Sequence, residues 1–267
     1  MENKSKELAV AIKAAQEAGK ILEKHFETEI LKEFKEDASV VTLADRECED
    51  IIKKIILSTY PGHSILGEET GMTENNTEYV WHIDPVDGTR NFSNGIPLFA
   101  VSVALVHQDE VIVGVIYNPA TRSLFYAEKG KGAYLNDVKI FVSKDDAAHS
   151  IISGGKSRKE LDRKLYRKLM HDLPEKINGV TIRDFGAATL DLAYLACGGT
   201  EATIQIGLHI HDFAAGVLIV EEGGGKITTL DGNPWKFPEG CFVASNGIFH
   251  DKLVEEVQKQ ISALGKK

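Results

Sequence analysis

The chain has few cysteines, no long apolar run and fewer basic than acidic residues. Cys48, Cys197 and Cys241 are the three cysteines among 267 residues, and no two of them form a CxxC pair. This pattern indicates reduced, mostly buried thiols in a cytoplasmic protein. The 31 basic and 40 acidic residues give a formal net charge of −9, which disfavours nucleic acid and anionic membranes as partners.

The sequence shows neither the features expected of a signal peptide nor an apolar run long enough for a membrane-spanning helix. The first ten residues, MENKSKELAV, lack the apolar core of a signal peptide, and apolar runs such as GVLIV are too short to span a bilayer. Hydrophobic residues make up 43% of the chain and charged residues 27%, which is ordinary for a soluble globular enzyme. The sequence therefore predicts a cytoplasmic protein with a sizeable core and no membrane partner.

The periodicity predicts a layered α/β (α+β) fold with mixed sheets. Apolar residues at helical spacing predict an N-terminal helix and a second helix from Thr42 to Tyr60. Three β-rich stretches between Leu98 and Glu128 predict an antiparallel meander. In the second half, strands expected at 150–155, 180–185, 201–206 and 241–245 alternate with helices expected at 158–173, 187–196 and 212–225, before a C-terminal helix.

The pattern of expected elements changes from β-rich to alternating strand and helix at a polar stretch from Lys144 to His149. We therefore expect two parts, 1–146 and 147–267, packed as one compact unit.

The segment DPVDGT carries the clearest chemical signal. Asp84 and Asp87 follow an apolar strand, so both carboxylates and the carbonyl of Val86 could face one point. Hard divalent cations such as Mg²⁺ prefer such an oxygen-rich shell. Gly88 and Thr89 then open an expected helix whose free N–H groups suit a phosphate oxygen. The alternative is a Pro-Asp-Gly turn with a helix cap.

Further acids stand at the ends of three other expected elements. Glu68 and Glu69 end a strand, Asp45 occupies the N3 position of a capping box that begins at Thr42, and Asp212 opens an apolar helix. Each has a structural alternative as a surface acid or a cap. None of them decides the function alone.

A zinc site at His209 and His211 is a competing interpretation of this region. HxH on a strand is a common ligand pair. No third nitrogen or sulfur ligand follows at a telling spacing, and the other candidate ligands are all oxygens, which favours a hard cation over zinc.

Two long segments resemble the signatures of a known family. WHIDPVDGTRNFSNGIPLFAVSVAL and HDFAAGVLIVEEGGG are similar to the first and second signatures of the inositol monophosphatase family of magnesium-dependent, lithium-sensitive phosphatases. VVTLAD, GEE and RDFGAATLDLA occur in the family order. The resemblance implies an αβαβα sandwich, a homodimer, two or three Mg²⁺ ions and a small phosphorylated sugar or polyol as substrate.

The resemblance also assigns roles to individual positions. One Mg²⁺ would be held by Glu68, Asp84 and the carbonyl of Val86. A second would be held by Asp84, Asp87 and Asp212, and a weaker third would lie by Glu68. Asp45 and Thr89 would orient and deprotonate the attacking water, supported by Glu69. The N–H groups of Gly88 and Thr89 would hold the phosphate. The other expected substrate contacts are Lys35, Arg183, Gly186, Ala187, Ala188 and Gln205.

Three positions depart from the family pattern and limit the assignment of a substrate. His211 replaces the usual Trp before the second-signature Asp, and Gln205 stands where animal members have a Glu that contacts substrate hydroxyls. Lys35 is not in perfect register with the family lysine near the metals.

Inositol 1-phosphate is the first expected substrate. Fructose 1,6-bisphosphate, histidinol phosphate and 3′-phosphoadenosine 5′-phosphate are alternatives within the family. A non-catalytic phosphosugar sensor is an alternative of another class, marked by loss of a metal-binding acid, and none of these acids is lost here.

Overall fold

The computed structural model describes residues 4–26, 32–34, 40–75, 77–146, 150–157 and 159–264. Within them the helices are α1 (Lys6–Phe26), α2 (Leu43–Thr59), α3 (Thr89–Phe92), α4 (Glu160–Lys176), α5 (Ala188–Ala196), α6 (Ile210–Glu222) and α7 (His250–Leu264). No helix of this part of the chain is both long enough and apolar enough to cross a membrane.

Eight strands form the first sheet, in the order β10-β9-β8-β7-β6-β5-β3-β4. Their bounds are β3 (Ser64–Gly67), β4 (Gly71–Thr73), β5 (Tyr79–Asp87), β6 (Ala100–His107), β7 (Glu110–Asn118), β8 (Ser123–Glu128), β9 (Ala133–Leu135) and β10 (Val138–Ile140). The predicted antiparallel meander is confirmed by β6, β7 and β8. β3 and β5 run parallel, so their carboxyl ends meet at one edge of the sheet.

Five strands form the second sheet, in the order β12-β11-β13-β15-β14. Their bounds are β11 (Ile151–Lys156), β12 (Thr181–Ile182), β13 (Ala202–Ile206), β14 (Lys226–Thr229) and β15 (Phe242–Ser245). A separate small hairpin pairs β1 (Lys32–Phe34) with β2 (Val40–Thr42). β12 is shorter than the expected strand at 180–185, since only Thr181 and Ile182 pair with β11. The chain turns later, at Gly186, where φ is +70°.

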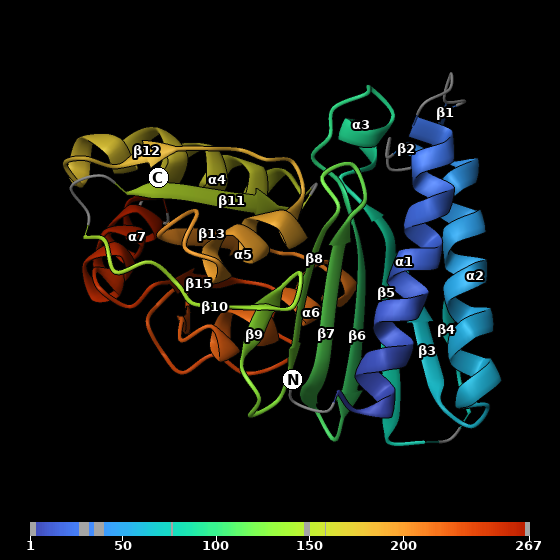
Figure 1. The fold of residues 1–267 in the computed structure, drawn as a ribbon. Coiled ribbons are helices and arrows are strands. Elements are labelled where there is room, and N and C mark those ends of the chain that lie inside the picture. Colours follow the sequence, from blue (N-terminus) through green and yellow to red (C-terminus); the bar gives the residue numbers. More distant parts are fainter. Residues whose placement is uncertain are drawn as a thin grey trace.

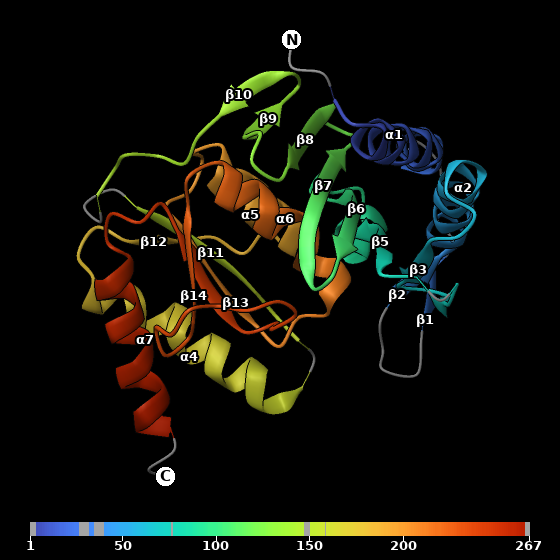
Figure 2. The same cartoon turned by 90° about the horizontal axis from the view of Figure 1, so that it is seen from below.

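The layers follow the order helix, sheet, helix, sheet, helix (Figures 1 and 2). α1 and α2 cover one face of the first sheet, α5 and α6 lie between the two sheets, and α4 and α7 cover the outer face of the second sheet. The αβαβα prediction is therefore confirmed. The division into parts 1–146 and 147–267 remains a proposal, and residues 147–149 lie outside the described part.

α6 is the central helix because it is apolar on nearly every side. Phe213, Ala214 and Val217 are buried within the core that joins both sheets. A helix that is hydrophobic all round requires partners on each face, which the two sheets and α5 provide. This arrangement fixes the direction in which the first turn of α6 points.

Gly114 on β7 lets α6 approach the sheet at backbone distance. A Cβ built on Gly114 would lie 2.6 Å from the carbonyl oxygen of Ala215 and 3.0 Å from its Cα. No side-chain movement can relieve that contact, because the obstructing atoms belong to the main chain. The glycine therefore sets the spacing between α6 and the first sheet.

We expect Gly114→Ala to lower the free energy of unfolding by roughly 1–3 kcal/mol, the usual range for overpacking a core. Urea denaturation of the metal-free protein measures this change. Gly62→Ala is the matched control, because a Cβ at Gly62 meets no atom within 4 Å. Equal midpoints for the two variants would show that α6 shifts without cost.

Candidate active site

A β-bulge at the end of β5 brings the two aspartates of DPVDGT onto one side. β5 pairs with β6 through Asp84↔Ser102 and Asp87↔Ala100, so β5 has one extra residue between them. Such a bulge changes the direction of the side chains that follow it. The N–H of Val86 donates to Asp84 Oδ1 over 3.0 Å, which fixes that carboxylate within the turn.

Gly88 allows the chain to leave the bulge and enter α3. Its φ is +85°, and a Cβ there would lie 2.8 Å from the carbonyl oxygen of Leu98. Thr89 then begins the expected helix, which has four residues. The hydroxyl of Thr89 donates to the carbonyl oxygen of Val86 over 3.0 Å, so the turn closes on itself.

Asp87, at the end of β5, is held by Thr189, at the start of α5. The N–H and the hydroxyl of Thr189 both donate to Asp87 Oδ2, at 2.7 and 2.5 Å. Asn91 makes a second link of this kind, since its Nδ2 donates to the carbonyls of Leu98 and Phe185, each at 2.7 Å. The DPVDGT turn is thereby tied to the start of α5.

Four acids from three elements share this region. Burial raises the pKa of Asp84 well above its usual range, and the charges of Glu68, Asp87 and Asp212 raise it further. Burial likewise raises the pKa of Asp87 to about 7, with the charge of Asp212 adding to it and the hydrogen bonds from Thr189 opposing it. The other three acids therefore lie close enough to Asp84 to disfavour its ionisation.

Asp212 and Asp45 are each fixed by a helix terminus. Asp212 Oδ2 accepts from the N–H of His209 over 2.8 Å at the start of α6. Asp45 Oδ2 accepts from the N–H and hydroxyl of Thr42, at 2.7 and 2.5 Å, so the predicted cap at Asp45 is confirmed. Each of these helix caps therefore fixes the position of a carboxylate beside the cluster.

Asp45 faces the two acids that follow β3. Burial raises its pKa to about 7, against the hydrogen bonds from Thr42, and the charges of Glu69 and Glu68 raise it further. Its other oxygen, Oδ1, is buried and has no hydrogen-bond partner among the described residues. A buried carboxylate oxygen of this kind is suited to a bound water or cation.

The donor set fits a hard cation. Every acid in the group offers oxygen. Burial, together with neighbouring carboxylates, raises the pKa values of Asp84, Asp87 and Asp45, and a bound cation would oppose these shifts. In the described part of the chain, no three His, Cys, Asp or Glu side chains already converge at ligand spacing. Glu68, Asp87 and Asp212 thus lie near enough to Asp84 to raise its pKa without forming a closed set of ligands in the described residues.

The residues expected at the substrate edge fall into two groups. Arg183 is exposed, with its guanidinium donating to the carbonyl of Ile182 over 2.9 Å, and Gly186 turns the chain beside Asn91. Ala187 and Ala188 are buried at the start of α5. Lys35 lies outside the described residues.

Gln205 does not present its side chain to solvent, and the expected contact with substrate hydroxyls stays a prediction. It is fully buried on β13, where Nε2 donates to Thr203 Oγ1 over 2.8 Å and to Asp191 Oδ2 over 3.4 Å. Its Oε1 lies over Gly155 on the neighbouring strand, in space that a side chain there would fill. The small residue at 155 and the buried acid at 191 direct the amide inward.

The two histidines before Asp212 stack on one another rather than forming a separate ligand group. The rings of His209 and His211 lie 5.6 Å apart at 17°. Nε2 of His211 lies 3.5 Å from Asp212 Oδ1. The acidic cluster, not the histidine pair, is the centre of the site.

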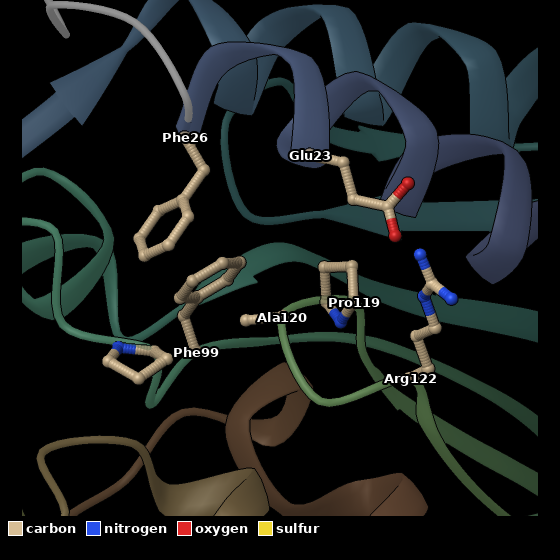
Figure 3. Close-up of a pocket in the computed structure, with 7 residues that line it drawn as sticks. Glu23, Phe26, Phe99, Pro119, Ala120 and Arg122 are labelled. Atoms are coloured by element: carbon tan, nitrogen blue, oxygen red, sulfur yellow. The ribbon is translucent and has the colours of Figure 1, made fainter.

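A pocket of about 280 Å³ lies elsewhere, beside the end of α1 (Figure 3). The rings of Phe26 and Phe99 line it together with Pro119, and Glu23 and Arg122 face one another at one side. None of the clustered acids lines it, so this pocket is separate from the candidate active site.

Thr189 and Asn91 are the residues of this site that the sequence did not reveal. Both act through contacts between segments about 100 residues apart, and the spacing of neighbouring residues does not encode such contacts. The nearest signal is that each lies within a family-like segment, RDFGAATLDLA or DPVDGTRNF.

Comparison with known proteins gives one consistent answer. The family model described as "Inositol monophosphatase family" matches residues 3–262. An inositol-1-monophosphatase of Mesorhizobium japonicum is 37% identical, over 96% of this chain and 97% of its own. A fructose-1,6-bisphosphatase/inositol-1-monophosphatase of Aquifex aeolicus is 36% identical, over 97% of this chain and 98% of its own.

A solved structure agrees with the sequence comparisons. The extragenic suppressor protein suhB of Bartonella henselae superimposes with a TM-score of 0.89 at 34% identity, covering 96% of this chain and 99% of its own. With the acids gathered where both signatures meet, these matches show that the chain belongs to the inositol monophosphatase family of phosphoric monoester hydrolases.

Proposed function

We propose that this chain hydrolyses small sugar or polyol phosphates with Mg²⁺, and that inositol 1-phosphate is its preferred substrate. The observation that carries the proposal is the electrostatic interaction of Asp84 with three other acids. Asp87 lies on β5 like Asp84, Glu68 lies in the turn after β3, and Asp212 lies on α6. Ionised carboxylates in such a cluster repel one another, and a bound cation would neutralise their charge. The net charge of −9 is then compatible with an anionic substrate, since bound cations face the phosphate.

The metal-holding residues of the proposal are Glu68, Asp84, the Val86 carbonyl, Asp87 and Asp212. Bound Mg²⁺ would supply charge neutralisation and an activated water. In this proposal Asp84 would be a ligand of two ions, and Glu68 would help to hold a third. Lithium sensitivity is part of the same proposal.

The chain's own groups would orient the reaction. Asp45 would accept a proton from the attacking water, since its unpartnered Oδ1 is fixed by the cap on Oδ2. Thr89 would orient that water. Burial raises the pKa of Asp45, and the charge of Glu69 would support Asp45 as the proton acceptor by raising it further. The N–H groups of Gly88 and Thr89 would face the phosphate oxygens.

Fructose 1,6-bisphosphate is the second candidate substrate. The Aquifex aeolicus relative carries both activities in its name. Gln205 is neutral and turned inward, so it places no negative charge where a second phosphate would approach. A homodimer in the cytoplasm, without nucleic-acid partners, is the accompanying proposal.

The test is phosphate release from inositol 1-phosphate, fructose 1,6-bisphosphate, histidinol phosphate and 3′-phosphoadenosine 5′-phosphate at millimolar Mg²⁺. We expect the highest kcat/KM for inositol 1-phosphate, loss of all activity with chelator and inhibition by lithium. Full activity after exhaustive chelation would overturn the metal assignment. Preference for another member of the panel would overturn the substrate assignment alone.

A further inference from the structure

α2 carries a row of three ionisable residues one helical turn apart. Asp45, Glu49 and Lys53 are spaced at i, i+4 and i+8, so they lie on one face of the helix. Asp45 belongs to the site described above. Glu49 is fully buried at 0% exposure, and a buried acid requires specific partners.

The partners of Glu49 are the backbone of the turn that carries the site's two glutamates. Glu49 Oε2 accepts from the N–H of Glu69 over 2.8 Å. Oε1 accepts from the N–H of Thr70 over 3.1 Å and from the hydroxyl of Thr70. Lys53 pairs with Oε1 over 2.9 Å and also donates to Thr70. Both carboxylate oxygens are thus engaged by donors.

These donors distinguish Glu49 from the acids of the cluster. Burial alone would raise the pKa of Glu49, but hydrogen bonds from Thr70, the Glu69 amide and Lys53 lower it below the usual range. The pKa values of Asp84 and Asp87 shift in the opposite direction, chiefly because of burial. Glu49 is therefore a satisfied anion whose charge is already balanced, and it is not a ligand for a further cation.

Gly67 makes the approach of Glu49 possible. A Cβ built on Gly67 would lie 2.2 Å from Glu49 Oε1 and 2.8 Å from Oε2. The carboxylate therefore occupies the space that any larger residue at 67 would need. The glycine before Glu68 and the glutamate on α2 form one complementary pair.

We propose that Glu49 is a positioning residue for the phosphatase reaction, which holds the Gly67–Thr70 turn so that Glu68 and Glu69 face Asp84 and Asp45. The proposal rests on the proposed function. The turn needs such a hold because its two acids repel the others in the cluster. Two N–H groups and one hydroxyl pulled toward α2 resist that repulsion before any cation is bound.

Glu49→Gln tests the proposal, since the amide keeps the shape but loses the charge and one acceptor. We expect Mg²⁺ affinity, measured by isothermal titration calorimetry, to fall at least about tenfold, in the range for groups that orient metal ligands. The kcat at saturating Mg²⁺ should stay within about threefold of the parent protein. Hydrogen exchange at the Glu69 and Thr70 amides in the metal-free protein should accelerate.

Glu47→Gln is the matched control, because Glu47 lies on the same helix with its side chain 45% exposed. It should change none of these measurements. If Glu49→Gln does not fold, Gly67→Ala replaces it, since the added methyl group displaces the carboxylate without removing its charge. We expect the same loss of affinity and the same faster exchange.

Unchanged Mg²⁺ affinity together with unchanged amide exchange would overturn the proposal. A parent protein that neither binds Mg²⁺ nor releases phosphate would instead overturn the proposed function. In that case the exchange at Glu69 and Thr70 still decides whether Glu49 holds the turn.

Discussion

Asp84→Asn should lower turnover by at least about three orders of magnitude while the protein still folds. The charges of Glu68, Asp87 and Asp212 all act on Asp84, and in the proposed function Asp84 would be a ligand of two cations. A thousandfold loss corresponds to about 4 kcal/mol of transition-state stabilisation. Steady-state phosphate release at saturating Mg²⁺ measures it.

The same substitution should make the metal-free protein more stable at neutral pH. A carboxyl whose pKa is raised by folding favours the folded state less and less as pH rises above its unfolded value near 3.8. Asn carries no such penalty and accepts the same N–H from Val86. Opposite changes in turnover and urea midpoint would thus identify a functional acid.

Asp109→Asn is the control for this comparison, since it makes the same chemical change in an exposed turn where φ is +61°. It should leave turnover and metal-free stability nearly unchanged. Near-native turnover of Asp84→Asn would reduce Asp84 to a turn residue.

Asp45→Asn and Thr89→Val should each lower kcat by roughly 10²–10⁴-fold, the range for a positioned proton acceptor. If the two residues act on one water, the double variant should lose less than the product of the single losses. A double-mutant cycle on kcat at saturating Mg²⁺ measures the coupling. Thr121→Val, in an exposed turn, is the control for removing a threonine hydroxyl.

Fully multiplicative losses would show that Asp45 and Thr89 act independently. The result would then favour the contact seen here, in which the Thr89 hydroxyl donates to Val86, as the main role of that residue. The control must retain the parent kcat for either conclusion to hold.

Long periodic elements were predictable from the sequence, whereas short edge strands were not. The helices now seen as α1 and α2 were expected because an apolar stripe repeats over several turns. β4, β10 and β14 were not expected, since three or four residues give too few alternations to stand out. Their pairing depends on neighbouring strands rather than on their own composition.

In the candidate site, too, residues within a local pattern were predictable, whereas residues defined by distant contacts were not. Asp84, Asp87 and Asp212 were recognisable because each follows a local pattern, a strand end or a helix start. Glu49 was missed because its significance lies in a glycine 18 positions later, which the pattern of α2 does not show. Gln205 was expected to face the substrate because of its position in the family pattern, which does not show that its amide donates to Thr203 and, over a longer distance, to Asp191.

The acids come from both sides of residues 147–149, and this permits a use in protein engineering. Glu68, Asp84 and Asp87 precede that stretch, whereas Asp212 and Thr189 follow it. Two fragments cut there would each carry an incomplete set of acids. Each fragment could be fused to one of two other proteins, and phosphate release would then report that those two proteins bind each other. Substitution at the Asp87–Thr189 contact would reduce reassembly of the fragments on their own.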